Sequence, residues 1–333
     1  MATMPLPPAP SGITQVALRA LRRLRGHDPA ADLDLTAREA SEHVFCFVGE
    51  FGYELVSWLP YLLDLKKHVP DFRLVTYARP GSKVFYYFSD EHHEFGVGTV
   101  GNMWGDVPTY TRLQASLGGK PIAFPRATRD IKVSDRPWRM KDIHKQIPND
   151  AYYELLDYSS VRLPLPFQTE RPFVVVNNKF TAEWGGPPVN FFSREELFAI
   201  RDFLVGRGYA VVYNHFREKT RTNKELGFDL DDSGIFGPVE HTFDLSDEYR
   251  KTNDIGERNR MQLSIYNQAA FVVAPQGGSC YIPAICRRDL VMLMRIGDYI
   301  DYRELGRVYG VDVNVFYEVP HMLAWLGQKL PAR

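Results

Sequence analysis

Two hydrophobic patterns alternate along the first third of the chain, and their order predicts parallel strands. Residues 43–48 (HVFCFV) form a short apolar run that ends at a glycine, as buried strands do. Residues 53–69 carry leucines at helical spacing, and Pro60 within them predicts a kink. Residues 72–78 return to a strand pattern. Strand, turn, helix and strand make a βαβ unit, in which the two strands pair in parallel.

A second and cleaner series begins near residue 171. The capping box of Ser193 and Glu196 predicts the start of a helix over residues 194–205, and Gly206 and Gly208 predict its end. Further helices are expected at 257–269, from 281 and at 322–330, and strands at 173–176, 209–213, 271–274, 290–294 and 311–319. This half therefore reads as a second α/β, Rossmann-like domain.

The length of the chain and the weak pattern between the two series suggest the domain boundaries. A chain of 333 residues exceeds the usual size of one hydrophobic core. Between residues 90 and 168 we find no clear periodicity and expect only a short helix at 152–157. The predicted organisation is an N-terminal extension (1–42), a first Rossmann-like domain (43–170) and a second one (171–333).

Composition and charge narrow the class of protein. Lys and Arg number 40 against 41 for Asp and Glu, so nothing attracts the whole chain to nucleic acid. Three cysteines without a C-x-x-C pair predict neither a disulfide framework nor a zinc site. No apolar run is long enough to span a membrane, and we expect a cytoplasmic protein. Residues 13–25 form a basic amphipathic segment, for which peripheral contact with the inner face of a membrane and packing on the protein body both stay open.

The turn from Gln276 through Gly277 and Gly278 to Ser279 is the strongest chemical candidate. It follows an apolar strand and precedes a helix, where an open α/β sheet presents backbone N–H groups to an anion. Two glycines also let a diphosphate approach the main chain. A tight turn without a ligand is the alternative interpretation.

Two other strand ends of the same domain should lie at this edge of the sheet. Both carry amides and cations that suit a leaving diphosphate, although solvated loop charges would look the same. The candidates are Asn177, Asn178 and Lys179 after one strand, and Asn214, His215, Arg217 and Lys219 after the next.

Three acidic residues and one histidine are weaker candidates. Glu50 follows the first strand and Glu54 lies one turn into the helix, where either carboxylate would suit a general base for an acceptor hydroxyl. Helix N-terminal electrostatics alone also favours an acidic residue there. Glu240 and His241 are candidates for contact with the ribose or base of a nucleotide.

Two further patterns are set aside, and no metal site is predicted. Residues 96–101 match a dinucleotide-binding glycine pattern, but no strand precedes them and no helix follows. Asp229, Asp231 and Asp232 resemble a metal-binding Asp-x-Asp motif but are expected to be solvated. Asp90, His92 and His93 form a second candidate cluster. A metal site is the weaker interpretation of it, because adjacent histidines point apart on a regular element.

The segment from Gly49 to Leu55 (GEFGYEL) and the strand and turn from Phe271 to Ser279 resemble bacterial polysaccharide glycosyltransferases of the GT-B type. The resemblance covers about a third of the chain, and residues 96–168 match no known pattern. It implies two Rossmann-like domains facing a central cleft, with the donor nucleotide in the C-terminal domain and the acceptor in the N-terminal one. It also implies that no metal or other cofactor is bound.

These features together predict a glycosyltransferase of polysaccharide biosynthesis. The expected partners are a nucleotide-diphosphate sugar, as co-substrate, and a glycan or lipid-linked acceptor; transfer is expected to be metal-independent and inverting. Two alternatives stay open. One is a polysaccharide-modifying transferase with another phosphorylated donor, for example a pyruvyl transferase, and the other is a non-catalytic nucleotide- or glycan-binding protein.

Overall fold

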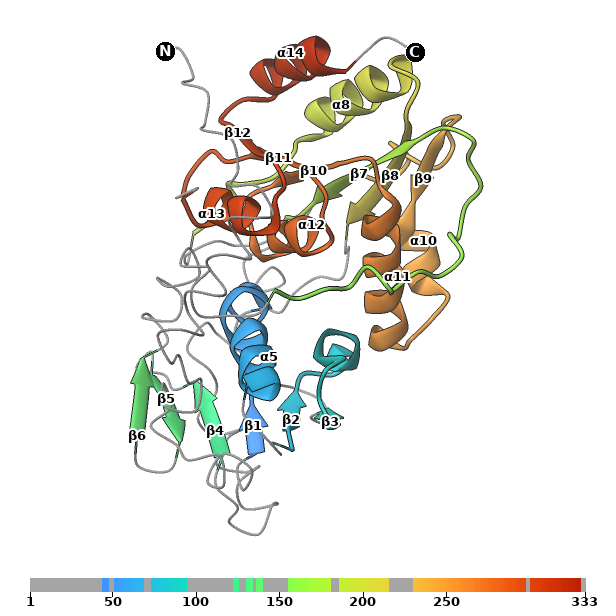
Figure 1. The fold of residues 1–333 in the computed structure, drawn as a ribbon. Helices are drawn as coiled ribbons and strands as arrows, with labels where there is room; N and C mark the ends of the chain where they lie inside the picture. Colours follow the sequence, from blue (N-terminus) through green and yellow to red (C-terminus); the bar gives the residue numbers. More distant parts are fainter. Residues whose placement is uncertain are drawn as a thin grey trace. The chain divides into compact units, whose positions relative to one another are not determined.

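The chain divides into two compact units, which are described one at a time. The computed structural model describes residues 44–47, 51–68, 73–94, 122–125, 130–133, 136–139, 155–180, 186–215, 230–297 and 300–330. The first unit runs to Arg79 and continues over Phe85–Leu156. The second comprises Pro80–Val84 and Asp157–Arg333. Each unit contains its own sheet (Figure 1).

The sheet of the first unit has the strand order β3-β2-β1-β4-β5-β6 among its described strands. The first three pair in parallel, as does β1 with β4, and β5 and β6 continue the sheet in antiparallel fashion. Parallel pairing of the two predicted strands is thus confirmed. The strands are β1 (Val44–Cys46), β2 (Val75–Ala78), β3 (Glu91–Glu94), β4 (Ile122–Pro125), β5 (Asp130–Val133) and β6 (Arg136–Arg139).

The helix after β1 is irregular where the sequence predicts a kink. It begins as α4 (Phe51–Tyr53), widens into the π-helical turn η1 (Glu54–Trp58) and continues as α5 (Leu59–His68). Pro60 is the second residue of α5, and the π-helical turn ends at the residue before α5 begins. A proline inside a regular α-helix clashes with the carbonyl four residues earlier, and a π-turn is one way in which a helix accommodates it.

Strand β3 was not predicted, because its sequence, EHHE, has no apolar run. The strand forms through backbone pairing with β2. His92 stacks on Tyr86 and His93 stacks on Tyr77, so the two imidazoles point apart as expected. Near its start, Lys66 of α5 pairs with Asp90. The 3-10 helix η2 (Ser82–Tyr86) precedes this strand.

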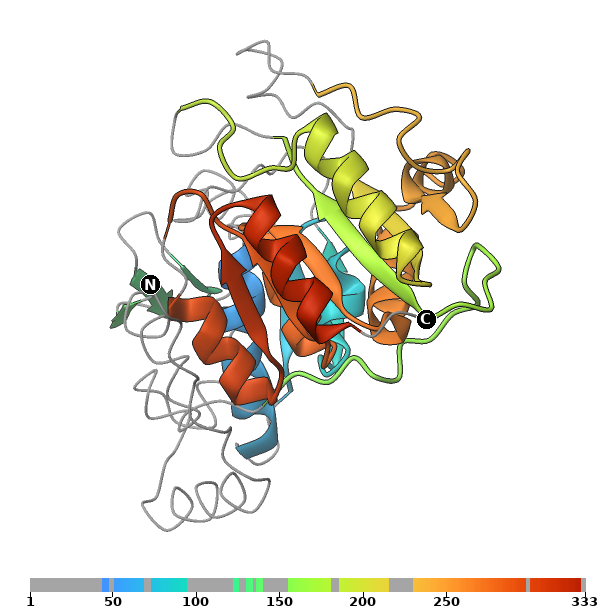
Figure 2. The ribbon, with the colours of Figure 1, turned by 90° about the horizontal axis from the view of Figure 1, so that it is seen from above.

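The sheet of the second unit is parallel throughout its described strands, in the order β12-β11-β10-β7-β8-β9 (Figure 1). Figure 2 shows the same unit from above. Numbered within the unit, this is the 3-2-1-4-5-6 order of a doubly wound dinucleotide-binding sheet. The second Rossmann-like domain is therefore confirmed. Its strands are β7 (Phe173–Asn178), β8 (Ala210–His215), β9 (Thr242–Asp244), β10 (Val272–Pro275), β11 (Leu290–Leu293) and β12 (Val313–Phe316).

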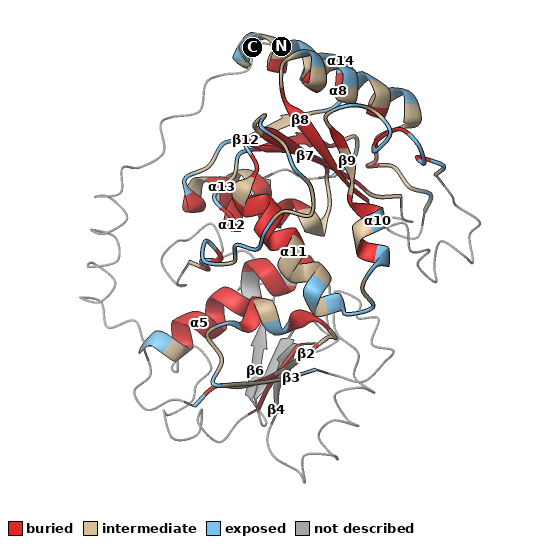
Figure 3. Ribbon diagram, turned by 90° about the vertical axis from the view of Figure 1, so that its right-hand side faces the viewer, coloured by how far each residue is buried: buried red, intermediate tan, exposed pale blue. Residues whose placement is uncertain are grey.

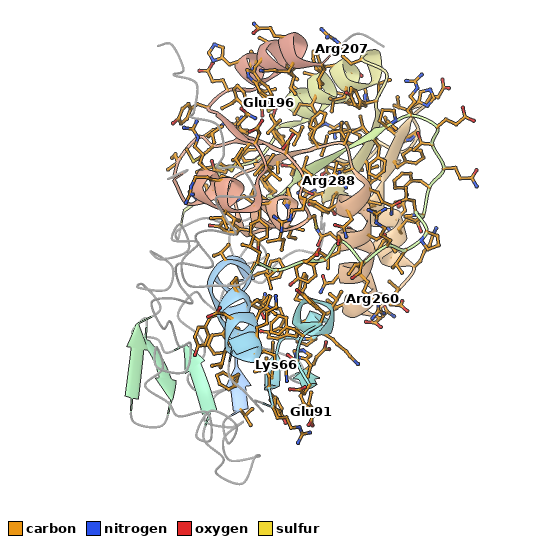
Figure 4. The ribbon with its side chains drawn as sticks, viewed as in Figure 1. Lys66, Glu91, Glu196, Arg207, Arg260 and Arg288 are labelled. Atoms are coloured by element: carbon orange, nitrogen blue, oxygen red, sulfur yellow. The ribbon has the colours of Figure 1, made fainter. Side chains whose placement is uncertain are left out.

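Helices cover both faces of this sheet. The helices α8 (Arg194–Gly206) and α14 (Val319–Lys329) pack on one face, where Arg207 donates to the carbonyls of Gly327 and Leu330 and so joins them (Figure 4). The Ser193 capping box is present as predicted. The remaining helical elements are α10 (Leu245–Arg250), α11 (Ile255–Gln268), η3 (Gly278–Cys280), α12 (Tyr281–Ile285) and α13 (Ile300–Tyr309). β7 and β8 are buried along their whole length (Figure 3).

Residues 157–170 belong to the second unit because they hydrogen-bond to α11. The amide of Asn267 donates to the carbonyls of Tyr158 and Val161, and Ser264 bonds both the N–H and the carbonyl of Leu163. The longer segment of this unit thus starts at Asp157. Residues 155–157 are not helical, which corrects that part of the predicted helix at 152–157. Among the described helices none is both long and apolar enough to cross a membrane.

Candidate functional site

The strand order of the second unit locates its most suitable ligand site. Successive connections leave β7 in one direction along the sheet and β10 in the other, so the order reverses between these two neighbouring strands. In open α/β sheets, ligands bind outside the carboxyl ends of the strands at this reversal. Lys179 follows β7, and the turn beginning at Gln276 follows β10. Two of the predicted anion-binding segments therefore meet at the reversal point.

Lys179 lies directly against the glycine turn. A Cβ atom added to Gly277 would be only 3.0 Å from Lys179 Nζ and 3.2 Å from its Cδ and Cε. The absence of a side chain at Gly277 thus lets the ammonium group lie beside the main chain of the turn. Among the described residues, the backbone N–H groups of Gly277, Gly278 and Ser279 have no acceptor. A cation and three backbone donors are arranged together there.

Gln276, predicted to contact the donor, forms side-chain hydrogen bonds that hold the turn in place. Its Oε1 accepts from the amide of Asn190 at 3.2 Å, and its Nε2 donates to the hydroxyl of Tyr302 at 3.0 Å. That hydroxyl in turn donates to the carbonyl of Gly277 at 3.3 Å. The side chain of Gln276 therefore fixes the conformation of the turn, and direct contact with the donor stays a prediction.

Cys280 closes the turn and is chemically inert there. Its backbone N–H donates to the carbonyl of Gly277 at 3.0 Å, and its Sγ donates to the carbonyl of Pro275 at 3.0 Å. Burial raises the pKa of the Cys280 thiol to about 12, although the charge of Lys179 acts to lower it. The thiol is protonated at neutral pH and holds the turn to the end of β10.

Two predicted asparagine ligands are buried and bonded within the protein. Asn178 exchanges two hydrogen bonds with the backbone of Phe192, its Nδ2 donating at 3.0 Å and its Oδ1 accepting at 2.9 Å. Asn214 donates to Asn177 Oδ1 at 2.8 Å and accepts from the hydroxyl of Tyr249 at 2.9 Å. Their side chains tie β7 and β8 to the surrounding elements, so they position the carboxyl edge and do not project beyond it.

Glu240 and His241 lie at the opposite edge of the sheet. They immediately precede β9, and the carbonyl of His241 accepts from the N–H of Val211 near the start of β8. The side chain of Glu240 is 86% exposed. The six residues of β8 separate this edge from the carboxyl ends by roughly 17 Å. They therefore lie away from the carboxyl ends of the strands, and their contact with the ribose or base of a nucleotide stays a prediction that this position does not favour.

Glu54 is buried at the centre of the first unit and its carboxylate is fully engaged. Its Oε2 accepts from Arg79 Nη2 and its Oε1 from the hydroxyl of Tyr86, both at 2.6 Å, and its side chain has no exposed surface. Burial, and then the charge of Glu54, raise the pKa of Tyr86 well above its ordinary value, so this hydroxyl remains a donor. An enclosed carboxylate with both oxygens bonded is a poor general base, so this position does not favour the role predicted for Glu54.

Of the two aspartates of the set-aside Asp-x-Asp pattern that the structure describes, Asp232 departs from expectation. Its carboxylate is buried and accepts from Tyr213 and from Nδ1 of His215, whereas Asp231 is exposed, as expected. His215 is the last residue of β8. No signal in the sequence distinguishes Asp232 from Asp231. In the described part of the chain, no cluster of His, Cys, Asp and Glu side chains is suited to a metal ion.

Several predicted residues lie outside the described residues. These are Glu50, Arg217 and Lys219, together with Asp229, the glycine pattern at 96–101 and the basic segment at 13–25. The assignments made for them stay predictions.

Comparison with known proteins identifies the type of fold. No protein-family model matches the chain, and no curated protein matches its sequence. Solved structures do match: the ADP-heptose LPS heptosyltransferase II of E. coli superposes with a TM-score of 0.56 and 14% identity, covering 87% of this chain and 98% of that one. The E. coli heptosyltransferase WaaC with ADP gives 0.50 and 11%, covering 86% and 99%. The fold is GT-B-like. At these identities the likeness concerns the fold, and function has to be argued from the site.

Proposed function

We propose that this protein is a glycosyltransferase that moves a sugar from a nucleoside-diphosphate donor to a glycan or lipid-linked acceptor in polysaccharide biosynthesis. The observation that supports this most is the placement of Lys179 against Gly277 at the strand-order reversal of the second unit. A diphosphate requires positive charge and unpaired N–H donors close together, and this turn offers both. Two proteins of the same fold are, by name, an ADP-heptose heptosyltransferase and a heptosyltransferase with bound ADP.

In the proposed reaction the bond between the anomeric carbon and the diphosphate breaks, and the electron pair passes to the phosphate oxygen. The ammonium of Lys179 and the amides of Gly277–Ser279 stabilise the charge that develops there. The acceptor hydroxyl attacks the anomeric carbon from the opposite side, which inverts the configuration. We assign the proton of that hydroxyl to Glu50, because Glu54 is committed to Arg79 and Tyr86. No metal takes part in this scheme.

Slow donor hydrolysis tests the proposal without knowledge of the acceptor. A panel of ADP-, UDP-, GDP- and dTDP-sugars should contain at least one that the protein hydrolyses and whose nucleoside diphosphate raises the melting temperature. Glu50→Gln should lower that hydrolysis at least tenfold and leave nucleotide affinity unchanged, because the substitution removes only the base. Glu54→Gln is the matched variant and should instead lower the melting temperature. A protein that neither binds nor hydrolyses any member of the panel would contradict the proposal.

A further inference from the structure

A buried histidine and aspartate form a second polar group at the carboxyl edge of the donor unit. His215 ends β8 and is the register partner of Asn178 on β7, the residue that immediately precedes Lys179. Nδ1 of His215 bonds Oδ2 of Asp232, and the hydroxyl of Tyr213 donates to the same oxygen. His215 is 6% exposed and Asp232 is 1% exposed. Strand pairing and the shared carboxylate therefore hold the imidazole in one place.

The bond to Asp232 determines which nitrogen of the neutral imidazole carries the proton. A carboxylate only accepts, so Nδ1 is the donor and Nε2 bears the lone pair. Nε2 has no partner among the described residues, yet it is not one of their fully buried unpaired polar atoms. It therefore keeps access to solvent. The arrangement presents a fixed hydrogen-bond acceptor at the end of β8, suited to a hydroxyl group.

The position of β8 indicates which hydroxyl that is. β8 is the second strand of the 3-2-1-4-5-6 order, next to β7. In dinucleotide-binding sheets of this order, an acceptor near the end of the second strand binds the ribose 2′-hydroxyl, a role usually taken by Asp or Glu. Here the strand ends in Asn214 and His215, and the side chain of Asn214 is already bonded to Asn177 and Tyr249. His215, supported by Asp232, is the acceptor that remains.

We propose that Nε2 of His215 accepts a hydrogen bond from the ribose 2′-hydroxyl of the donor nucleotide and so selects ribonucleotides over deoxyribonucleotides. The proposal rests on the proposed function, because it requires a nucleoside diphosphate at the adjacent turn. It makes His215 a specificity-determining residue and Asp232 a positioning residue that fixes the tautomer and orientation of the ring.

The test compares the affinities of ADP and 2′-deoxy-ADP, or of UDP and 2′-deoxy-UDP, by calorimetry on the full chain. The wild type should bind the ribonucleotide about tenfold more tightly, since the deoxy form leaves the acceptor unpaired. His215→Asn keeps an amide donor for Asp232 but removes Nε2, and should bring the ratio close to one. Tyr213→Phe is the matched control, because it loses one bond to Asp232 and retains the ring stack on Phe236; the ratio should persist.

Two results would overturn the inference. If the wild type binds a nucleoside diphosphate but shows no ribose preference, or if His215→Asn keeps the preference, His215 does not contact the hydroxyl and the proposed function is untouched. If the wild type binds no nucleoside diphosphate of the panel in either the ribose or the deoxyribose form, both proposals fall together. A purely structural role for His215 would lower the melting temperature and weaken both nucleotides equally, and it would leave the ratio unchanged.

Discussion

Lys179→Met should lower donor-sugar hydrolysis about 100-fold and weaken nucleoside-diphosphate binding about tenfold. Methionine keeps much of the apolar stem that lies along Gly277 but removes the ammonium beside the turn. The loss should be larger in turnover than in affinity, because the negative charge on the leaving diphosphate grows as the bond to the sugar breaks. Hydrolysis rates and calorimetric titrations on the same preparation measure the two effects.

Lys251→Met is the control for a general loss of positive charge. Lys251 lies in the same unit just after α10, is exposed, and pairs with Glu248 at 2.6 Å. Its replacement should change neither hydrolysis nor nucleotide affinity. Equal effects of the two substitutions would show that nucleotide binding depends on overall charge and not on the turn. An unchanged affinity in Lys179→Met would place the diphosphate elsewhere.

Arg79→Met should destabilise the first unit by about 3 kcal/mol. The substitution leaves the carboxylate of Glu54, which has no exposed surface, with only the hydroxyl of Tyr86 as a partner. Removing one member of a buried ion pair leaves the other charge buried without its partner. The expected loss of stability is at the lower end of the range usual for such pairs, because the Arg79 side chain is 31% exposed. Urea denaturation of the variant and the wild type provides the measurement.

Two further variants separate this effect from a loss of packing. Arg73→Met breaks an ion pair of the same 2.6 Å length with Glu91, but that pair is 68% and 40% exposed and its loss should change stability little. Adding Glu54→Gln to Arg79→Met should recover much of the lost stability, because the buried charge is then gone. If the double variant is as unstable as Arg79→Met alone, the contact of Arg79 with the Phe51 ring carries the effect.

The hydrophobic pattern was sufficient to predict the framework that positions the site. Strands β7, β8, β10 and β11 contain short apolar runs and are buried along their whole length, a signal that local sequence carries by itself. The turn after β10 and Lys179 after β7 followed from the rule that parallel strands share a carboxyl edge. Strand β3 could not be found this way, because four polar residues become a strand only through pairing with β2. Helix α13 did have a signal, in the spacing of Tyr302, Leu305 and Tyr309, that the prediction passed over.

The burial and the hydrogen-bond partners of individual polar side chains could not be predicted from the sequence. Glu54 and Asp232 were each expected to face solvent or a ligand, and both are buried by partners 17 to 32 positions away in the chain. The position of Glu240 could not be predicted either, because the three-residue strand β9 that follows it is too short to give a clear pattern. Such contacts arise from tertiary packing, which neither residue type nor local spacing determines.

The most direct test is a crystal structure of the protein with the nucleoside diphosphate that stabilises it best. The account predicts phosphate density within hydrogen-bonding distance of Lys179 Nζ and of the N–H groups of Gly278 and Ser279, beyond the carboxyl ends of β7 and β10. Ordered nucleotide away from this turn, with Lys179 not touching phosphate, would contradict it.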